Sequence, residues 1–315
     1  MTKTHPLENL ITSYLYEKDI TKGTSALYEI ILKQYLNYLK NHQILYATSQ
    51  NVKDYLSDIK DKGYSPSWIY NQMVILKGFY QYLSFNQVRL DLEEIYALNI
   101  TETLKNVHVE KKIKKPILTI KQAKHLILYL KNNRKYSWHY RDYALVFLMI
   151  TTGLRSIEVR RAKIKDLDVI HGKHILYIQG KGRDSADEFV KISSGLYEAI
   201  TDYLKIRKDH NPYLFVSKSK SSKKPLDRTA FNGLMKRILR DSGLSDTNIT
   251  AHSLRHTAAT INLKRGGTLE ETKRLLRHQE MSNTLIYTQD MDEKLNDTVS
   301  NLENYILGDE NHQNE

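Results

Sequence analysis

Several residues in the later part of the chain have types and spacings that suit chemistry on a phosphodiester. Cleaving this bond without a metal requires cations around the nonbridging oxygens, an in-line nucleophile, and an acid for the departing alkoxide. Arg155 follows a glycine that ends the apolar run YALVFLMIT, so we expect its guanidinium to sit at a fixed helix junction and bind phosphate. The alternative explanation is an ion pair with Glu158, three residues later on the same helix.

A second candidate cation lies in the segment ITAHSLRHTAAT. His252 and Arg255 are three residues apart, so on a helix they share a face near the N-terminus, where free backbone amides favour an anion. This pair could clamp a phosphate and move a proton. The alternative is a structural histidine beside a surface arginine. His256 lacks such a partner spacing, and we interpret it as structural.

The segment LLRHQEMSNTLIYTQD places His278 and Tyr287 nine residues apart. The chain has 22 tyrosines, so residue type alone does not distinguish Tyr287 from rings that fill a core or an interface. A phenol has an ordinary pKa of about 10, so attack by Tyr287 requires nearby cations or a base. Because the sequence contains no cysteine, disulfides, thiolate metal sites and cysteine nucleophiles are excluded.

The charge of the chain is unevenly distributed. The formal net charge is +12, yet residues 1–110 carry 11 Lys/Arg against 12 Asp/Glu, which leaves 37 against 24 for the remainder. A basic surface attracts polyanions, and without a lipidation motif or an amphipathic membrane-surface helix the expected polyanion is nucleic acid. A solvated basic face is the alternative. We find no apolar signal region or membrane-length apolar run, and we expect a cytoplasmic, nucleoid-associated protein.

The spacing of apolar residues predicts a mainly helical (α+β) protein of two domains. A helical N-terminal domain covers residues 1–106, a linker that ends in proline covers 107–116, and a second domain covers 117–315. In the first domain the pattern predicts four helices, over Leu7–Glu17, Thr24–Lys40, Gln50–Lys60 and Pro66–Phe85.

The second domain combines helices with one short β region. His174–Gln179 and Glu188–Ile192 alternate like two strands, and the turn between them displays Lys181 and Arg183. Two short helices are expected after Ser282. The remaining helical patterns cover Ser194–Arg207, Asp227–Ser242, His252–Lys264 and Leu269–Arg277.

The order of these motifs resembles that of the tyrosine recombinase, or phage integrase, family. TGLRSIEV, a lysine in a β-hairpin turn, HSLRHTAAT and LLRHQEMSNTLIYT follow one another with family-like spacing between about Pro116 and Gln289. Each motif alone is weak, whereas four in this order are specific. The resemblance implies a helical core-binding domain plus a catalytic domain that together form a C-shaped clamp on DNA. The first hundred residues fit that core-binding domain by size and place.

The resemblance also implies a role for each matching residue. Arg155 and Arg255 would hold the scissile phosphate, with Glu158 supporting the site. Lys181 would protonate the 5′-oxygen leaving group, His252 would assist proton transfer, and His278 would bond a nonbridging oxygen. Tyr287 would attack and leave a 3′-phosphotyrosine, without a metal, ATP or another cofactor. The expected DNA-binding residues are Lys111, Lys112, Lys114, Lys115 and Arg183.

The resemblance further implies how the protein would assemble. It would be a monomer or weak oligomer when free and a homotetramer on two specific DNA sites, with a possible accessory or partner recombinase. The strands would exchange through a Holliday junction. The biological task would be to integrate or excise a mobile element or to resolve DNA dimers. The tail after Tyr287 contains an amphipathic stretch that could pack on a neighbouring subunit or on its own, with Leu295, Val299, Leu302 and Ile306 at helical spacing.

Two other functions remain open at this stage. A type IB topoisomerase would use the same chemistry to relax supercoils as a monomer. An architectural DNA-binding protein would have lost catalysis, although the complete set of candidate residues argues against it.

Overall fold

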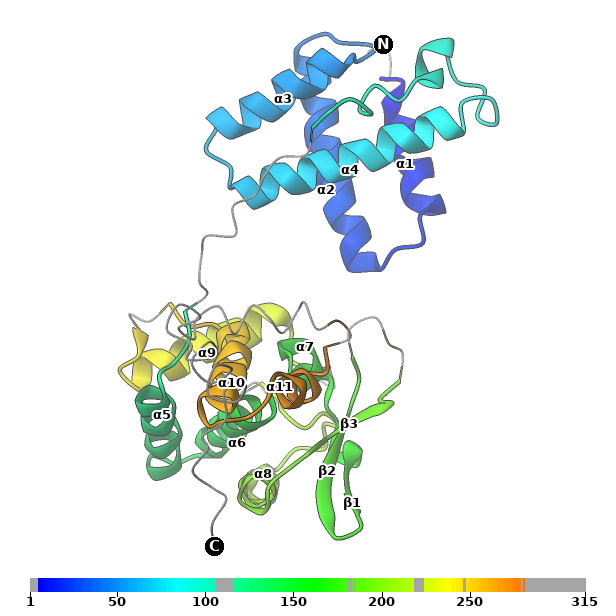
Figure 1. Cartoon of the computed structure of the whole chain (residues 1–315). Helices are drawn as coiled ribbons and strands as arrows, with labels where there is room; N and C mark the ends of the chain where they lie inside the picture. The colour runs from blue at the N-terminus through cyan, green and yellow to red at the C-terminus, as the bar shows by residue number, and fades with distance from the viewer. Residues whose placement is uncertain are drawn as a thin grey trace, which may run out of the picture. The chain divides into compact units, whose positions relative to one another are not determined.

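A computed structural model describes residues 5–105, 116–180, 183, 185–217, 224–245, 248–278 and 280. The chain divides into two compact units, residues 1–113 and 114–315. Figure 1 shows helices alone in the first unit and helices with a small sheet in the second. The prediction of a mainly helical protein with one small β region is therefore confirmed.

The described part of the first unit contains four α-helices, and three of them begin at a residue whose side chain caps their free amides. Thr21, Thr48 and Ser65 accept hydrogen bonds from backbone N–H groups in the first turns of α2, α3 and α4. The four helices match the predicted ones to within two residues at each end. They are α1 (Leu7–Glu17), α2 (Lys22–Asn41), α3 (Ser49–Asp61) and α4 (Pro66–Phe85), and a short 3₁₀ helix, η1 (Glu94–Ala97), follows.

The core of this unit contains several tyrosine rings whose hydroxyls are paired. The Tyr35 and Tyr80 hydroxyls lie 2.9 Å apart, and the Tyr55 hydroxyl donates to Gln72 at 2.9 Å. Burial raises the pKa of Tyr35 and of Tyr55, so these phenols stay protonated. They are structural rings, as the sequence analysis expected for most tyrosines.

The second unit is organised around one buried helix. Nearly all the middle residues of α6 are buried, and α6 packs against three other helices. Such an all-round apolar helix suits the centre of a core. The helices of this unit are α5 (Ile120–Asn132), α6 (Ser137–Thr152), α7 (Ser156–Arg161), α8 (Ser194–Ile206), α9 (Arg228–Asp241), α10 (Ala251–Lys264) and α11 (Leu269–Leu276).

An antiparallel sheet of order β1-β2-β3 completes this unit. The predicted hairpin is present as β2 (Lys173–Ile178) and β3 (Glu188–Lys191), with Ile178 opposite Glu188. A third strand, β1 (Leu167–Ile170), pairs with β2 and follows a 3₁₀ turn, η2 (Ile164–Asp166). β1 was not predicted from the sequence.

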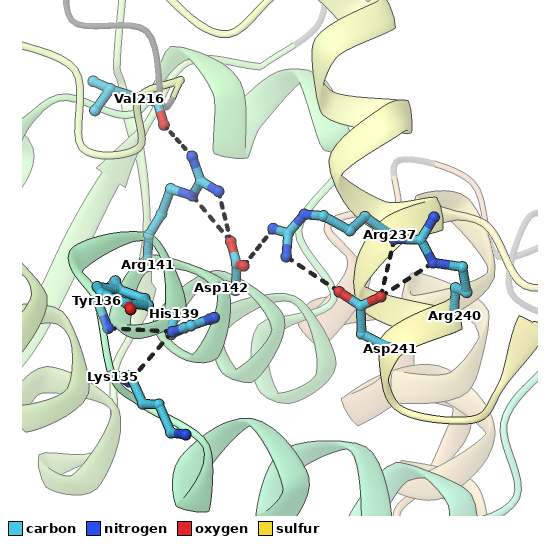
Figure 2. A network of polar contacts seen from close by, with 9 residues as sticks. All are labelled: Lys135, Tyr136, His139, Arg141, Asp142, Val216, Arg237, Arg240 and Asp241. Atoms are coloured by element: carbon cyan, nitrogen blue, oxygen red, sulfur yellow. Dashed lines mark hydrogen bonds and ion pairs between the residues drawn. The ribbon is translucent and has the colours of Figure 1, made fainter.

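A buried ionic network fixes the beginning of α6 to α9 (Figure 2). Asp142 is 1% exposed and accepts hydrogen bonds from Arg141 at 2.8 Å and from Arg237 of α9 at 2.5 Å. Arg141 also donates to the carbonyl of Val216 at 2.7 Å. Because a buried carboxylate is stable only when it is paired, this network holds α6 in place, and α6 leads directly to Arg155.

Among the residues that the structure describes, no helix combines the length and the apolar character that spanning a bilayer would require. The amphipathic stretch predicted after Ser282 lies outside these residues.

Candidate active site

Arg155 is the N-cap of α7 and lies at the helix junction that the sequence predicted. Gly153 ends α6 in a left-handed conformation, with φ of 61°, and the chain then turns into α7. Arg155 Nη1 donates to Glu158 Oε1 at 2.9 Å, and the Arg155 backbone N–H donates to Glu158 Oε2 at 2.6 Å. The ion pair considered as an alternative therefore exists. The Arg155 side chain is still 35% exposed, so it remains open to an anion from solvent.

Arg255 lies on α10 and is 2% exposed, so it is part of the core as well as a candidate cation. Its Nη1 donates to the carbonyl of Gly153 at 2.5 Å, and its Nη2 donates to the carbonyl of Leu276. One guanidinium thus joins the segment before Arg155 to the segment before His278. The surface position considered as an alternative for Arg255 is wrong.

The two histidines of α10 differ in exposure. His252 is exposed, whereas His256, one turn further along the helix, is buried. Their rings meet edge to face, with centroids 4.6 Å apart. His252 is therefore open to a substrate, and the burial of His256 agrees with a structural interpretation.

His278 follows α11 and stands among cations. Burial, together with the positive charges of Arg255, Arg155 and Arg277 and the nearby His252, lowers the pKa of His278 to about 4. The imidazole is therefore neutral at pH 7 and keeps one N–H donor. Arg155, His252, Arg255 and His278, which come from three separate segments of the chain, are therefore close enough to act on one another. Figure 1 shows the helices that carry or precede them, α7, α10 and α11, next to one another.

Arg277 is a residue of this site that the sequence analysis missed. Its Nη2 donates to Glu158 Oε2 at 3.0 Å, and its side chain is 12% exposed. It also ends α11 in the left-handed conformation, with φ of 53°, where glycine is the usual residue. An arginine at a helix C-terminus directly before a candidate catalytic histidine was the available signal.

The β2–β3 turn is attached to α7. Arg161, the last residue of α7, donates to the carbonyl of Gly180 at 3.3 Å. Within the turn, Gln179 donates to the carbonyl of Arg183 at 2.7 Å, and the Arg183 side chain pairs with Asp187 at 2.5 Å and Glu188 at 2.9 Å. The predicted DNA-binding residue Arg183 is thus half-exposed and already paired with two acids.

Six predicted site residues lie outside the described residues. They are the candidate acid, the candidate nucleophile and the linker lysines, namely Lys181, Tyr287, Lys111, Lys112, Lys114 and Lys115. Their positions in this chain remain predictions.

Comparison with known proteins identifies the family of the chain. The model of the phage integrase family matches residues 116–294, more than half of the chain. "Tyrosine recombinase XerA" of Pyrococcus horikoshii is 31% identical over 88% of this chain and 96% of its own length.

Two solved structures have the same fold. The "XerH site-specific recombinase bound to palindromic difH substrate" has a TM-score of 0.64 at 24% identity, over 82% of this chain and 73% of its own. A "lambda integrase dimer bound to a COC' core site" has a TM-score of 0.64 at 16% identity, over 92% of this chain and 79% of its own. Both agree with a helical N-terminal domain followed by an integrase catalytic domain. The chain therefore belongs to the phage integrase family and is a site-specific tyrosine recombinase.

Proposed function

We propose that this recombinase breaks and rejoins duplex DNA with Tyr287 as the nucleophile and with Arg155 and Arg255 as the phosphate-binding residues. The observation that carries the proposal is the proximity of Arg155, Arg255 and His278, with Arg255 bonded to Gly153 and to Leu276, the residues just before the other two. Two guanidinium groups around one phosphate would stabilise the negative charge that grows in the transition state.

In the proposed reaction, the Tyr287 oxygen attacks the scissile phosphorus and the bond from phosphorus to the 5′-oxygen breaks. Lys181 gives its proton to that oxygen, so the products are a 3′-phosphotyrosine and a free 5′-hydroxyl. His252, which is exposed, assists proton transfer. The neutral His278 donates a hydrogen bond to a nonbridging oxygen. A 5′-hydroxyl from a partner duplex then reverses the step, so neither ATP nor a metal is needed.

The proposed partner is double-stranded DNA that carries a specific site. The net positive charge of residues 111–315 supports this, since most contacts to duplex DNA are made to phosphates. The predicted N-terminal domain, residues 1–106, would act as a core-binding domain and close a C-shaped clamp with the catalytic domain, residues 117–315. The linker over 107–116 would cross the backbone with Lys111, Lys112, Lys114 and Lys115.

Lysines of the N-terminal unit are part of the same proposal. Lys33, Lys40 and Lys62 pair with acids at 2.6, 2.8 and 2.6 Å on an exposed surface. Exposed pairs contribute little to stability, so phosphates could replace the acids at small cost.

Assembly and biological role complete the proposal. Four protomers would act on two sites through a Holliday junction, at the nucleoid in the cytoplasm, with or without an accessory or partner recombinase. Relatives include a "TnP I resolvase" and a "Tyrosine recombinase XerC", and the compact N-terminal domain favours simple two-site recombination. Integration or excision of a mobile element and resolution of DNA dimers are the two candidate tasks.

The test begins with covalent capture in cells that express the full chain. DNA that remains bound after denaturation is sequenced at its attached ends, and the same chain with Tyr287→Phe serves as the control. We expect ends that map to a few sites with wild-type protein and none with the variant. Ends scattered over the genome would instead indicate a topoisomerase. An absence of ends with wild-type protein would indicate an architectural factor.

Duplexes made from the captured ends then test the nucleophile in vitro. On a nicked suicide substrate, Tyr287→Phe should bind with wild-type affinity and form no covalent product. Persistent product in that variant would place the nucleophile elsewhere, with Tyr305 and Tyr213 as the next candidates.

A further inference from the structure

The buried carboxylate of Glu158 is shared between two arginines from different helices. Its Oε1 accepts from Arg155 Nη1 at 2.9 Å, and its Oε2 accepts from Arg277 Nη2 at 3.0 Å. The Glu158 side chain is 1% exposed and the Arg277 side chain 12%, so both charges are largely removed from water. The group of three carries one net positive charge, and Arg155 is its most exposed member.

This distribution of charge matters because two anions compete for the Arg155 guanidinium: the Glu158 carboxylate and the proposed DNA phosphate. A buried carboxylate requires a cation, and without Arg277 its nearest guanidinium would be that of Arg155 alone. The carboxylate would then cancel most of the positive potential that Arg155 presents to solvent. With Arg277 in place, the carboxylate has a permanent second cation, and the group keeps an excess positive charge at its exposed end.

We propose that Arg277 is a positioning residue that neutralises Glu158 and so leaves the Arg155 guanidinium available to the scissile phosphate. The inference rests on the proposed function, because it takes Arg155 as a phosphate ligand. Arg277 itself touches neither DNA nor the reacting atoms in this proposal. It acts on the site in two ways: it neutralises Glu158, and its charge acts on the adjacent His278.

The backbone at Arg277 supports a role for its side chain. Arg277 has φ of 53° and ψ of 49°, a conformation that glycine adopts without strain and that other residues rarely adopt. Glycine would satisfy the turn after α11 but would leave Glu158 with one cation fewer. The guanidinium is also one of the charges that lower the pKa of His278, whose other charged or titratable neighbours are Arg155, His252 and Arg255.

The experiment measures single-turnover cleavage at saturating DNA, on suicide substrates built from the ends captured with wild-type protein. Wild-type cleavage is then already established, so failure of this inference cannot be confused with failure of the proposed function. Arg277→Met should cleave about 10- to 100-fold more slowly, the range expected when a catalytic group is displaced. The affinity for the site, measured by gel shift, should change by less than about threefold, because binding uses many phosphate contacts.

Three further variants separate positioning from folding. Arg277→Lys keeps the charge and should retain most of the rate. Arg277→Gly relieves the left-handed backbone and should fold at least as well as Arg277→Met, yet cleave as slowly. Arg274→Met, on the same helix and 77% exposed, is the matched control and should cleave at the wild-type rate.

The double variant Glu158→Gln with Arg277→Met provides the decisive comparison. A neutral glutamine no longer attracts Arg155, so the double variant should cleave faster than Arg277→Met alone. In the free protein, the pKa of His278, followed by NMR, should rise in Arg277→Met and stay unchanged in Arg274→Met. Wild-type cleavage by Arg277→Met, or a double variant that is slower than Arg277→Met, would overturn the proposal.

Discussion

The Arg255 guanidinium donates a hydrogen bond to the carbonyl of Gly153, 102 residues earlier in the chain, at 2.5 Å. A second hydrogen bond from the same guanidinium reaches the carbonyl of Leu276, so α10 holds the ends of α6 and α11 together. A side chain proposed to bind phosphate is thereby also a structural element of the core. Its substitution should affect stability as well as catalysis.

Replacing Arg255 with Ala should lower the free energy of unfolding by about 2–4 kcal/mol, because two backbone carbonyls lose their donor and a large buried side chain is removed. Urea unfolding measures this loss. Arg240→Ala is the control, since Arg240 is 69% exposed and pairs with Asp241 at the surface, and its effect should stay within about 0.5 kcal/mol. Equal stability of the two variants would mean that the Arg255 hydrogen bonds do not support the fold.

Gly153→Ala should destabilise the second unit by about 1–3 kcal/mol. A Cβ at Gly153 would lie 2.8 Å from Leu276 Cδ2, and the backbone there has φ of 61°. The variant should also cleave more slowly, because Arg155 follows two residues later. Gly233→Ala in α9 is the matched control: no atom lies within 4 Å of its added Cβ, and alanine favours a helix over glycine by up to about 1 kcal/mol. A Gly153→Ala variant as stable as wild type would contradict the observed close approach.

The lowered pKa of His278 predicts a pH dependence of stability. The folded protein holds His278 neutral down to about pH 4, whereas the unfolded chain binds a proton near the ordinary value of 6.5. Between these values the unfolded state binds more protons, so stability rises with pH and is lost as the pH falls from 6.5 towards 4. His278→Gln should flatten this slope in urea unfolding at a series of pH values. An unchanged slope would show that His278 titrates normally.

Lys181→Ala should slow cleavage of ordinary DNA by about 10²- to 10⁴-fold, as expected when a general acid is lost. A substrate with sulfur in place of the 5′-bridging oxygen needs no proton on its leaving group. It should therefore restore cleavage by Lys181→Ala strongly and by Arg155→Ala hardly at all. Arg183→Ala, two residues away, is the control, and the sulfur substrate should not restore its cleavage as it does for Lys181→Ala. Equal rescue of Lys181→Ala and Arg155→Ala would refute the assignment of Lys181 as the acid.

Deleting the chain after Gln289 tests the predicted amphipathic tail while it keeps every candidate catalytic residue. If the tail binds a neighbouring subunit, the truncated protein should occupy one site but lose cooperative assembly on two, as seen in gel-shift stoichiometry. If the tail covers its own subunit, its loss should lower the melting temperature and promote aggregation. A truncated protein of normal stability that still recombines two sites would exclude both possibilities.

The elements that the sequence predicted well are those whose pattern is complete within one segment. Helices α1 and α4 begin and end where predicted: the apolar spacing defines both, and in α4 a capping serine, Ser65, and a proline at the first turn agree with it. Strand β1 was missed because Leu167–Ile170 has four residues, none fully buried, and no alternation stands out. Its pairing with β2 is decided by the neighbouring strand, which the local pattern does not contain.

The site was predicted from the order of its motifs, while its charge pairing was not. The sequence indicated Arg155, His252, Arg255 and His278 through the family resemblance, and the structure brings these four together. The burial of Arg255 and the contact of Arg277 with Glu158 depend on segments about a hundred residues apart, so no spacing in the chain reveals them. Asp187 and Glu188, which pair with Arg183, are by contrast only four and five residues away in the chain, so their spacing was visible in the sequence.

The shortness of α7 has a consequence for local unfolding. A helix of six residues has too few internal hydrogen bonds to persist alone, so α7 depends on its contacts with other segments. Arg161 fixes it to the turn before β3, and Glu158 fixes it to the end of α11. In hydrogen exchange, the amides of Val159 and Ala162 should therefore open together with these two segments as one cooperative unit. Opening of α7 would then carry Arg155 and Glu158 with it, so the charge pairing of the site would be lost in the same event.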